Sequence, residues 1–353
     1  MKFVKMHGTG NDYVYINLFE GFDDSVPVTY DKDGKLLTVE GEDVSKVAIK
    51  VSDRHFSIGA DGLICVAPSR VRASEDEKNG ADVRMIMFNA DGSEGLMCGN
   101  GIRCVAKFAF DKRLLSPEII STGENTGSCE IKAETASGIK TLKLTVEKDK
   151  ASEKAVCTYV EVNMGQAILK AEDIPVKVAE MGAQAMIATD DPLYGADVPK
   201  GAVIKRMLRV DGKDYSVTCV SMGNPHCVVF MKDSKGTLIN DSLGGDVDGL
   251  ELEKIGPLFE NHPAFPEKIN TEFVEVIDDH TVKMRVWERG SGETLSCGTG
   301  TCAVTVAAVL NGFVKRGTEV EVKIRGGSLY DTWLETGEVL MKGPAETSFV
   351  GEC

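Results

Sequence analysis

One segment of the chain occurs twice, and this duplication constrains the fold more than any other feature. FNADGSEGLMCGNG at 88–101 aligns without a gap with WERGSGETLSCGTG at 287–300. In both copies an aromatic residue lies ten positions before the cysteine, and a glutamate lies four positions before it. A long period with only two copies predicts a pseudo-symmetric pair of domains and not a solenoid.

A second, shorter match lies upstream in each half. KMHGTGNDYVYI contains a Gly-Asn step that ends at Asn11, and SMGNPHCVVF contains one that ends at Asn224. These asparagines precede the cysteine of their half by comparable distances, 87 and 73 positions. We therefore expect a first half over residues 1–157 and a second half over 158–341, each built as strand, Cys-Gly turn and helix.

The periodic segments predict a mixed α/β fold. Alternating or β-branched segments indicate strands at 1–6, 13–18, 82–88, 141–148, 159–164, 215–222, 281–288, 320–325 and 338–343. Helices are expected at 43–54, 101–115 and 301–314. The last is apolar nearly all round, which predicts a helix enclosed by sheet. Acidic or Gly-rich stretches at 21–43 and 71–81, and a further stretch around 176–202, are interpreted as solvent-exposed insertions.

Composition limits the class of protein. The 353 residues are 42% hydrophobic, and the longest apolar run is too short for a membrane span. With no signal-peptide pattern, we expect a soluble, cytoplasmic protein. The formal net charge of −15 argues against a nucleic acid or an anionic membrane as partner. Ten scattered cysteines are not a disulfide framework, and Cys65 and Cys227 are expected to be buried.

Each Cys-Gly turn predicts an anion site with a thiol at its entrance. Backbone N–H groups in a first helical turn lack intrahelical partners and carry the positive end of the helix dipole. Glycine lets a ligand approach that backbone closely. The same field favours a thiolate and is expected to lower the pKa of the cysteine toward neutrality. The two sites consist of Cys98 with Gly99 and Asn100, and of Cys297 with Gly298 and Thr299.

Two such thiols predict inversion of a stereocentre. A carboxylate held by both helix ends would place its α-carbon between the two sulfurs. One sulfur would remove the α-proton while the other delivers a proton from the opposite side. Because a single base tends to return the proton to the same face, the duplication predicts racemisation or epimerisation.

Six ordered segments resemble the diaminopimelate epimerase family: KMHGTGNDYV, RHFSIGADGLI, FNADGSEGLMCGNGIRC, SMGNPHCVVF, KINTEFVEV and WERGSGETLSCGTGTCA. The resemblance implies pyridoxal-independent conversion of LL- to meso-diaminopimelate for lysine and peptidoglycan, with no cofactor or metal. It also implies two domains, each a β-barrel-like sheet around a central helix, with the active site in a cleft between them. A homodimer is implied, with residues 342–353 returning to the first domain and Phe349 near the dimer contact.

The resemblance also assigns roles to residues of this chain. Cys98 and Cys297 match the catalytic pair, Cys98 accepting the proton from the LL isomer and Cys297 from the meso isomer. Arg289 suits a bidentate hold on the distal carboxylate. His226 and Glu288 match residues that tune the thiols. The substrate-binding positions implied are Asn11, Asn89, Gly99, Asn100, Asn224, Asn270, Glu288, Arg289, Gly298 and Thr299.

One position departs from the family pattern. Gly62 stands in the GADG segment where many members carry glutamine, and glycine offers no side chain to a substrate. Asn89 and Asn270 are also open to a simpler interpretation as turn residues. Cys104 and Cys302 follow the two catalytic positions at unequal distances and are assigned to helix packing.

Three other interpretations are weaker. A four-cysteine zinc site would need Cys98 and Cys104 to act with Cys297 and Cys302, at internal spacings wider than or at the edge of the usual range. The glycine-rich turns lack the lysine of a phosphate-binding loop and a complete dinucleotide fingerprint. Proline racemases and hydroxyproline epimerases share the two-thiol logic, but this chain has Asn100 and Ser296 where those enzymes usually carry histidine and proline.

Overall fold

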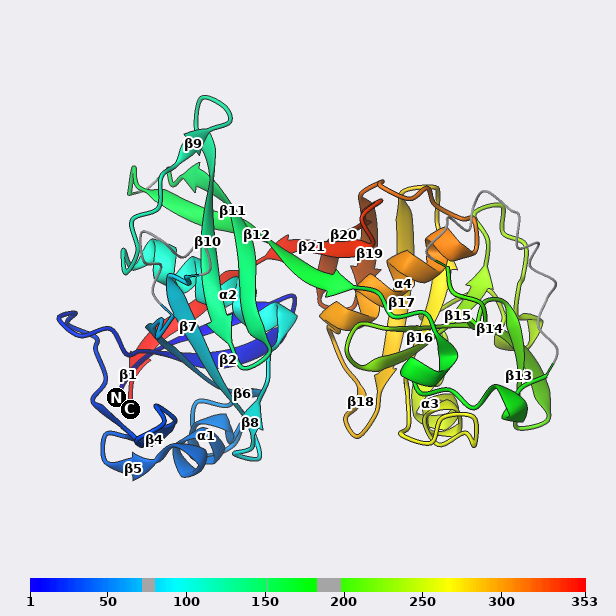
Figure 1. The fold of residues 1–353 in the computed structure, drawn as a ribbon, viewed down its shortest axis with the longest axis horizontal. Helices are drawn as coiled ribbons and strands as arrows, with labels where there is room; N and C mark the ends of the chain where they lie inside the picture. The colour runs from blue at the N-terminus through cyan, green and yellow to red at the C-terminus, as the bar shows by residue number, and fades with distance from the viewer. Residues whose placement is uncertain (72–79, 151, 183–197) are drawn as a thin grey trace. The chain divides into compact units, whose positions relative to one another are not determined.

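The chain folds into two compact units. The computed structural model describes residues 1–71, 80–150, 152–182 and 198–353. Unit 1 comprises residues 1–163 and 342–353, and unit 2 comprises residues 164–341. The chain leaves unit 1 within strand β12 (Ala155–Gln166) and returns within β21 (Glu338–Pro344) (Figure 1). The repeat placed this limit at 157/158, also within β12.

Unit 1 is a mixed sheet with two helices. Its strands follow the order β22, β1, β2, β6, β7, β10, β11, β12, with parallel pairing between β2 and β6 and between β7 and β10. The elements are β1 (Lys2–Gly8), β2 (Asn11–Asn17), β3 (Val28–Tyr30), β4 (Leu36–Val39), β5 (Glu42–Asp43), α1 (Val44–Ser52), β6 (Gly62–Pro68), β7 (Val83–Asn89), β8 (Glu94–Gly95), α2 (Gly99–Asp111), β9 (Ile120–Ser121), β10 (Thr126–Thr135), β11 (Gly138–Lys148) and β22 (Glu346–Glu352).

Unit 2 repeats this plan. Its strands follow the order β13, β14, β15, β16, β17, β19, β20, with parallel pairing between β15 and β16 and between β17 and β19. The elements are β13 (Arg206–Val210), β14 (Lys213–Ser221), β15 (Pro225–Lys232), α3 (Leu252–Glu260), β16 (Asn270–Val276), β17 (Thr281–Glu288), β18 (Gly292–Glu293), α4 (Gly298–Leu310), β19 (Val320–Ile324) and β20 (Gly327–Trp333), with short 3-10 helices at Ala171–Asp173, Val178–Glu180 and Asp241–Leu243.

The two units therefore match element by element. In each, a hairpin is followed by a helix, then by a strand parallel to the hairpin, and then by the strand that leads into the cysteine turn. Helix α2 packs on β1, β2 and β11 in unit 1, and α4 packs on β14, β15, β16 and β20 in unit 2. All residues of α4 except Thr299 are buried, as expected for an apolar helix enclosed by sheet.

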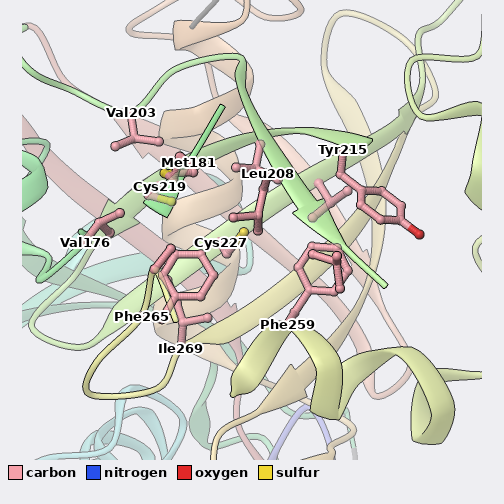
Figure 2. Packing of buried hydrophobic residues seen from close by; sticks show 14 of the residues in the cluster. Val176, Met181, Val203, Leu208, Tyr215, Cys219, Cys227, Phe259, Phe265 and Ile269 are labelled. Atoms are coloured by element: carbon pink, nitrogen blue, oxygen red, sulfur yellow. The ribbon is translucent and has the colours of Figure 1, made fainter. Parts of the chain in front are cut away.

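The core of unit 2 shows why the region after β15 folds against the sheet. Tyr215 and Phe259 lie with ring centroids 5.2 Å apart (Figure 2). The ring centroids of Phe259 and Phe273 are 5.4 Å apart. Phe259 comes from α3, and burying an aromatic side chain of this size contributes about 2 kcal/mol or more. Helix α3 is not among the helices predicted from the sequence; it is only nine residues long and contains Pro257.

Most sequence-based expectations for the elements are confirmed. All nine predicted strands overlap strands of the structure, and all three predicted helices overlap helices, with ends that differ by up to four residues. The interpretation of 21–43 as solvent-exposed is wrong in part, because this stretch forms strands β3 to β5 and buries Val26, Leu36 and Val39 in a core with α1. Residues 72–79 and 183–197 of the other two candidates lie outside the described residues, while Val176 and Met181 are buried.

Candidate active site

The turn in unit 1 holds Cys98 at the start of α2. Cys98 is the N-cap of the helix, and its sulfur accepts a hydrogen bond from Gly101 N at 3.3 Å. The thiol also lies 3.2 Å from Asn11 Oδ1, to which it donates. Asn11 is held in turn by donating from Nδ2 to Asp61 Oδ2 at 2.7 Å. The two duplicated features of this half, the Cys-Gly turn and the Gly-Asn step, thus meet at one sulfur.

Cys98 is half-buried, and its electrostatic surroundings are mixed. Removal of the sulfur from water raises the pKa of the Cys98 thiol, while hydrogen bonds from Gly101 N and Tyr13 and the charge of Arg103 act to lower it. Arg103 is fully buried in α2 and donates from Nε to Pro344 O at 3.2 Å. The charge of Arg103 therefore favours the thiolate of Cys98.

The turn in unit 2 has the same backbone plan with a different sulfur environment. Cys297 is the N-cap of α4, but its side chain accepts no capping hydrogen bond. Its sulfur lies 3.5 Å from Thr299 Oγ1, and the residue is only 5% exposed. The first-turn N–H groups of Gly298 and Thr299 have no intrahelical acceptor, which leaves them suited to an anion.

Carboxylates surround the sulfur of Cys297. Burial raises the pKa of this thiol well above its ordinary value, and the charges of Glu288 and Glu272 raise it further. A cysteine thiolate beside two carboxylates is disfavoured by repulsion as well as by lost hydration. The expectation that both thiol pKa values are lowered toward neutrality is therefore wrong for this structure, because burial raises each pKa more than the hydrogen bonds from the first helical turn lower it.

Behind Cys297 lies a buried hydrogen-bonded chain. His226 Nδ1 lies 2.7 Å from Glu272 Oε1, and both side chains are fully buried. The other ring nitrogen, Nε2, lies 3.1 Å from Asn224 Oδ1. The structure thus brings the predicted residues His226 and Asn224 together with Glu272, which the sequence analysis did not single out.

Strand β17 ends at Glu288, and Arg289 begins the turn that follows. Glu288 accepts a hydrogen bond from Thr294 Oγ1. Arg289 donates from its backbone N to Asn270 Oδ1 at 2.9 Å, and from Nη1 to Glu267 O at 2.9 Å. Its guanidinium is thus anchored at one nitrogen, and the side chain is partly exposed.

The two asparagines with a simpler interpretation have local partners. Asn270 is buried and caps the backbone of Arg289, as described above. Asn89 donates from Nδ2 to Ser93 Oγ at 2.9 Å, inside the turn that follows β7. Both side chains therefore shape the loops that lead toward the cysteines.

Gly62 occupies a position with no room for a side chain. An ideal Cβ there would lie 2.1 Å from Phe88 O and 2.9 Å from a ring carbon of Tyr13. The family's frequent glutamine would therefore require the Phe88 backbone to move. In this chain Gly62 reflects a close approach of β6 to β7, and Tyr13 fills the space beside it.

The glycine three residues after each cysteine allows another close approach. A Cβ on Gly300 would lie 2.8 Å from Glu272 Oε1 and 3.2 Å from the sulfur of Cys297. A Cβ on Gly101 would instead meet Ile64 Cδ1 at 2.7 Å. Glycine thus brings the helix backbone against a carboxylate in unit 2 and against an aliphatic side chain in unit 1.

The remaining sequence expectations concern metal and membrane. No group of three or more His, Cys, Asp or Glu residues suited to a metal ion occurs among the described residues. Cys104 and Cys302 are completely buried, in keeping with helix packing, and Cys65 and Cys227 are buried as predicted. In the described parts of the chain, every helix is too short or too polar to cross a bilayer.

Solved structures with the same fold define a class. The chain aligns over its full length with a predicted epimerase from Pseudomonas aeruginosa (TM-score 0.52, 14% identity, 98% of that chain). It aligns equally with a PhzF-family phenazine biosynthesis protein from Bacillus anthracis (TM-score 0.56, 14% identity, 98% of that chain). At this identity the likeness establishes the fold alone, that of the two-unit epimerases and their phenazine-pathway relatives.

Sequence similarity identifies the family. The family model described as diaminopimelate epimerase matches residues 3–170 and 218–348. A diaminopimelate epimerase from Acetivibrio thermocellus is 45% identical over all of this chain and 98% of its own length. One from Agathobacter rectalis is 45% identical over all of this chain and 99% of its own length. The chain belongs to the diaminopimelate epimerase family and is an isomerase that acts on an amino acid.

Proposed function

We propose that this protein interconverts LL- and meso-diaminopimelate through a pair of cysteines, Cys98 and Cys297. The observation that supports this most is the duplicated turn, in which a cysteine caps a buried helix in each unit. The names of the full-length relatives supply the substrate. Conversion of this substrate serves the route to lysine and peptidoglycan precursors.

The proposed reaction exchanges one proton for another on opposite faces of the α-carbon. The thiolate of one cysteine takes the α-proton. An S–H bond forms, the C–H bond breaks, and its electron pair remains on carbon as an enolate-like carbanion. The thiol of the other cysteine then gives its proton to the opposite face, which forms the new C–H bond and leaves a thiolate there. Atoms and charge balance, and only the roles of the two sulfurs are exchanged.

The substrate carboxylate supplies the reason for the helix ends. Negative charge that develops on the α-carbon spreads into this carboxylate in the transition state. Donors fixed in advance, such as the first-turn N–H groups at Gly99 and Gly298, stabilise that charge without reorganisation. Removing one such donor from an oxyanion site typically costs about 2.7–4 kcal/mol of transition-state stabilisation.

The two sulfurs differ in how readily they ionise, because their surroundings differ in charge. Burial raises the thiol pKa at both turns, but Arg103 counteracts it at Cys98, whereas Glu288 and Glu272 reinforce it at Cys297. Cys98 is therefore the sulfur that ionises more readily. Its assignment as the base toward LL-diaminopimelate rests on the resemblance to the family. Cys297, held as a thiol, is the matching acid and becomes the base toward the meso isomer.

The distal end of the substrate requires a second set of contacts. Among the described residues the guanidinium of Arg289 is anchored through Nη1, and its other N–H groups are proposed to bind a carboxylate. Asn11 and Asn224 are proposed to contact the polar groups nearer the reacting carbon, because each lies in the hydrogen-bonded surroundings of its cysteine.

Proton exchange with solvent tests the proposal. The protein is incubated with LL-diaminopimelate in heavy water, and the meso product is analysed by mass spectrometry and NMR. We expect deuterium at the inverted centre of the product. Unlabelled meso product, or an absence of conversion, would contradict the proposed function.

A further inference from the structure

Glu272 is a carboxylate in the middle of the core of unit 2. Every residue of β16 is buried, and the Glu272 side chain has no exposed surface. Burying an ionisable group costs free energy unless partners satisfy it. Within the described residues Oε1 pairs with His226, but Oε2 has no hydrogen-bond partner. Packing alone therefore does not explain this residue, and a role in the site is a better explanation.

Comparison with unit 1 supports this view. In unit 1, Val14 lies three positions after Asn11 and pairs with Leu63. In unit 2, Cys227 lies three positions after Asn224 and pairs with Thr271. The next residue along the second strand is Ile64 in unit 1 and Glu272 in unit 2. The sheet thus accepts an aliphatic side chain at this position, and the carboxylate is not needed for the strand to pack.

The hydrogen bonds of His226 specify the orientation of an amide. Asn224 Oδ1 faces Nε2 at 3.1 Å, and in the tautomer that carries its proton on Nε2 the ring donates to this oxygen. The other ring nitrogen, Nδ1, lies 2.7 Å from Glu272 Oε1. With its oxygen turned toward the ring, Asn224 presents its N–H groups on the other side, where they suit a carboxylate or carbonyl oxygen.

We propose that Glu272 is a positioning residue: it fixes the ring of His226 and, through that ring, the side-chain amide of Asn224. This inference rests on the proposed function for its substrate but on the hydrogen-bonded chain for its mechanism. No hydrogen bond joins Glu272 to Asn224 among the described residues, so its effect on that amide passes through His226. Its charge also acts directly on Cys297. The other ionisable groups that act on Glu272 are Glu288, Cys297 and Cys227.

The kinetic test uses two substitutions of Glu272. Glu272→Ile supplies the side chain that unit 1 carries at the equivalent position, and Glu272→Gln retains a hydrogen-bonding partner for the ring. We expect E272I to raise KM for diaminopimelate about tenfold, equivalent to about 1.4 kcal/mol, with a smaller change in kcat. E272Q should recover most of the loss. An unchanged KM in E272I would overturn the proposal.

A double-mutant cycle separates positioning from general destabilisation. If Glu272 acts through Asn224, then Asn224→Ala alone and the E272I/N224A pair should show nearly the same KM. Effects that multiply would contradict the relay. The matched control is Glu275→Gln, which removes a second buried carboxylate from the same strand, one that pairs with Lys232 at 3.4 Å. KM in E275Q is expected to remain that of the unaltered protein.

An NMR measurement tests the relay independently of turnover. The side-chain amide signals of Asn224 are assigned by their loss in N224A. We expect these signals to move in E272I and to return toward their original positions in E272Q, although Glu272 does not contact Asn224. Signals that stay in place in E272I would overturn the inference. If the protein does not convert diaminopimelate, the proposed function fails, while this measurement still decides the relay.

Discussion

Cys98 and Cys297 each cap a helix of 13 residues, yet the side chains around their sulfurs differ in charge. In unit 1 the sulfur receives a hydrogen bond from Gly101 N and is influenced by the cation of Arg103. In unit 2 the sulfur has no capping bond and lies in the field of carboxylates. The comparison teaches that a duplicated segment can place a cysteine at the start of a helix in each unit, while the side chains around the two sulfurs shift the thiol pKa values to different degrees.

The substitutions that create this difference occupy equivalent positions. Unit 1 carries Asn89 and Ile64 where unit 2 carries Glu288 and Glu272. The aligned repeat and the strand register establish both correspondences. Two neutral side chains in one half thus correspond to two carboxylates in the other.

The largest expected effect comes from removing either sulfur. Cys98→Ser or Cys297→Ser should lower kcat about 10²–10⁴-fold, the usual contribution of a positioned acid or base. Because both groups act on one carbon, the double variant should be little worse than either single variant. Rates from polarimetry or chiral chromatography provide the measurement. Near-normal activity in either single variant would remove that sulfur from the mechanism.

The next test compares stability at one register position in the two units. Gly62→Ala places a Cβ 2.1 Å from Phe88 O, so the backbone must shift, and we expect a loss of about 1–3 kcal/mol in the free energy of unfolding. Asn270→Gly, at the equivalent position, removes the hydrogen bond to Arg289 N and should cost about 1 kcal/mol. Urea unfolding followed by circular dichroism measures both. Equal stability of G62A and the unaltered protein would contradict the close approach.

The glycines in the turns provide a matched pair of smaller effects. Gly101→Ala meets the end of the Ile64 side chain, which can rotate, so activity should fall by less than about threefold. Gly300→Ala meets Glu272 Oε1 at 2.8 Å and the Cys297 sulfur at 3.2 Å, so kcat should fall about tenfold. Steady-state kinetics on both variants checks this order. A more severe effect of G101A would reverse the comparison.

The smallest expected effect comes from neutralising Glu288. Glu288→Gln removes a negative charge that raises the pKa of the Cys297 thiol after burial has raised it. A lower pKa means more thiolate at a given pH, so iodoacetamide should label Cys297 faster in E288Q at mildly alkaline pH. The rate at Cys98 should not change. Peptide mass spectrometry follows each cysteine, and slower labelling of Cys297 would contradict the assigned role of the carboxylate.

Much of this site could be predicted from the sequence because its chemistry is local. The Cys-Gly turns, the helices that follow them and the Gly-Asn steps are each contained in a few consecutive residues. The repeat marks both Asn11 and Cys98, but their contact across 87 residues is a finding of the structure. Helix α3 was missed because a nine-residue segment with an internal proline gives a weak helical pattern.

The features that the sequence did not reveal depend on burial and on strand register. Glu272 lies 46 residues from His226, and only the parallel pairing of β15 with β16 places them together. The direction of the thiol pKa shifts depends on how completely each sulfur is removed from water, which helix-terminus arguments alone do not reveal. Tyr13 reads as an ordinary strand residue, and only the fold brings it to Cys98.

The most direct test of the difference between the turns is a site-resolved titration of the two thiols. Alkylation of Cys98 and Cys297 in the unaltered protein is measured across a range of pH, and the midpoint of each profile is compared. Both midpoints should lie above that of an ordinary cysteine, because burial raises the thiol pKa at both positions, and Cys98 should ionise at the lower pH. Ionisation of Cys297 before Cys98 would contradict the account.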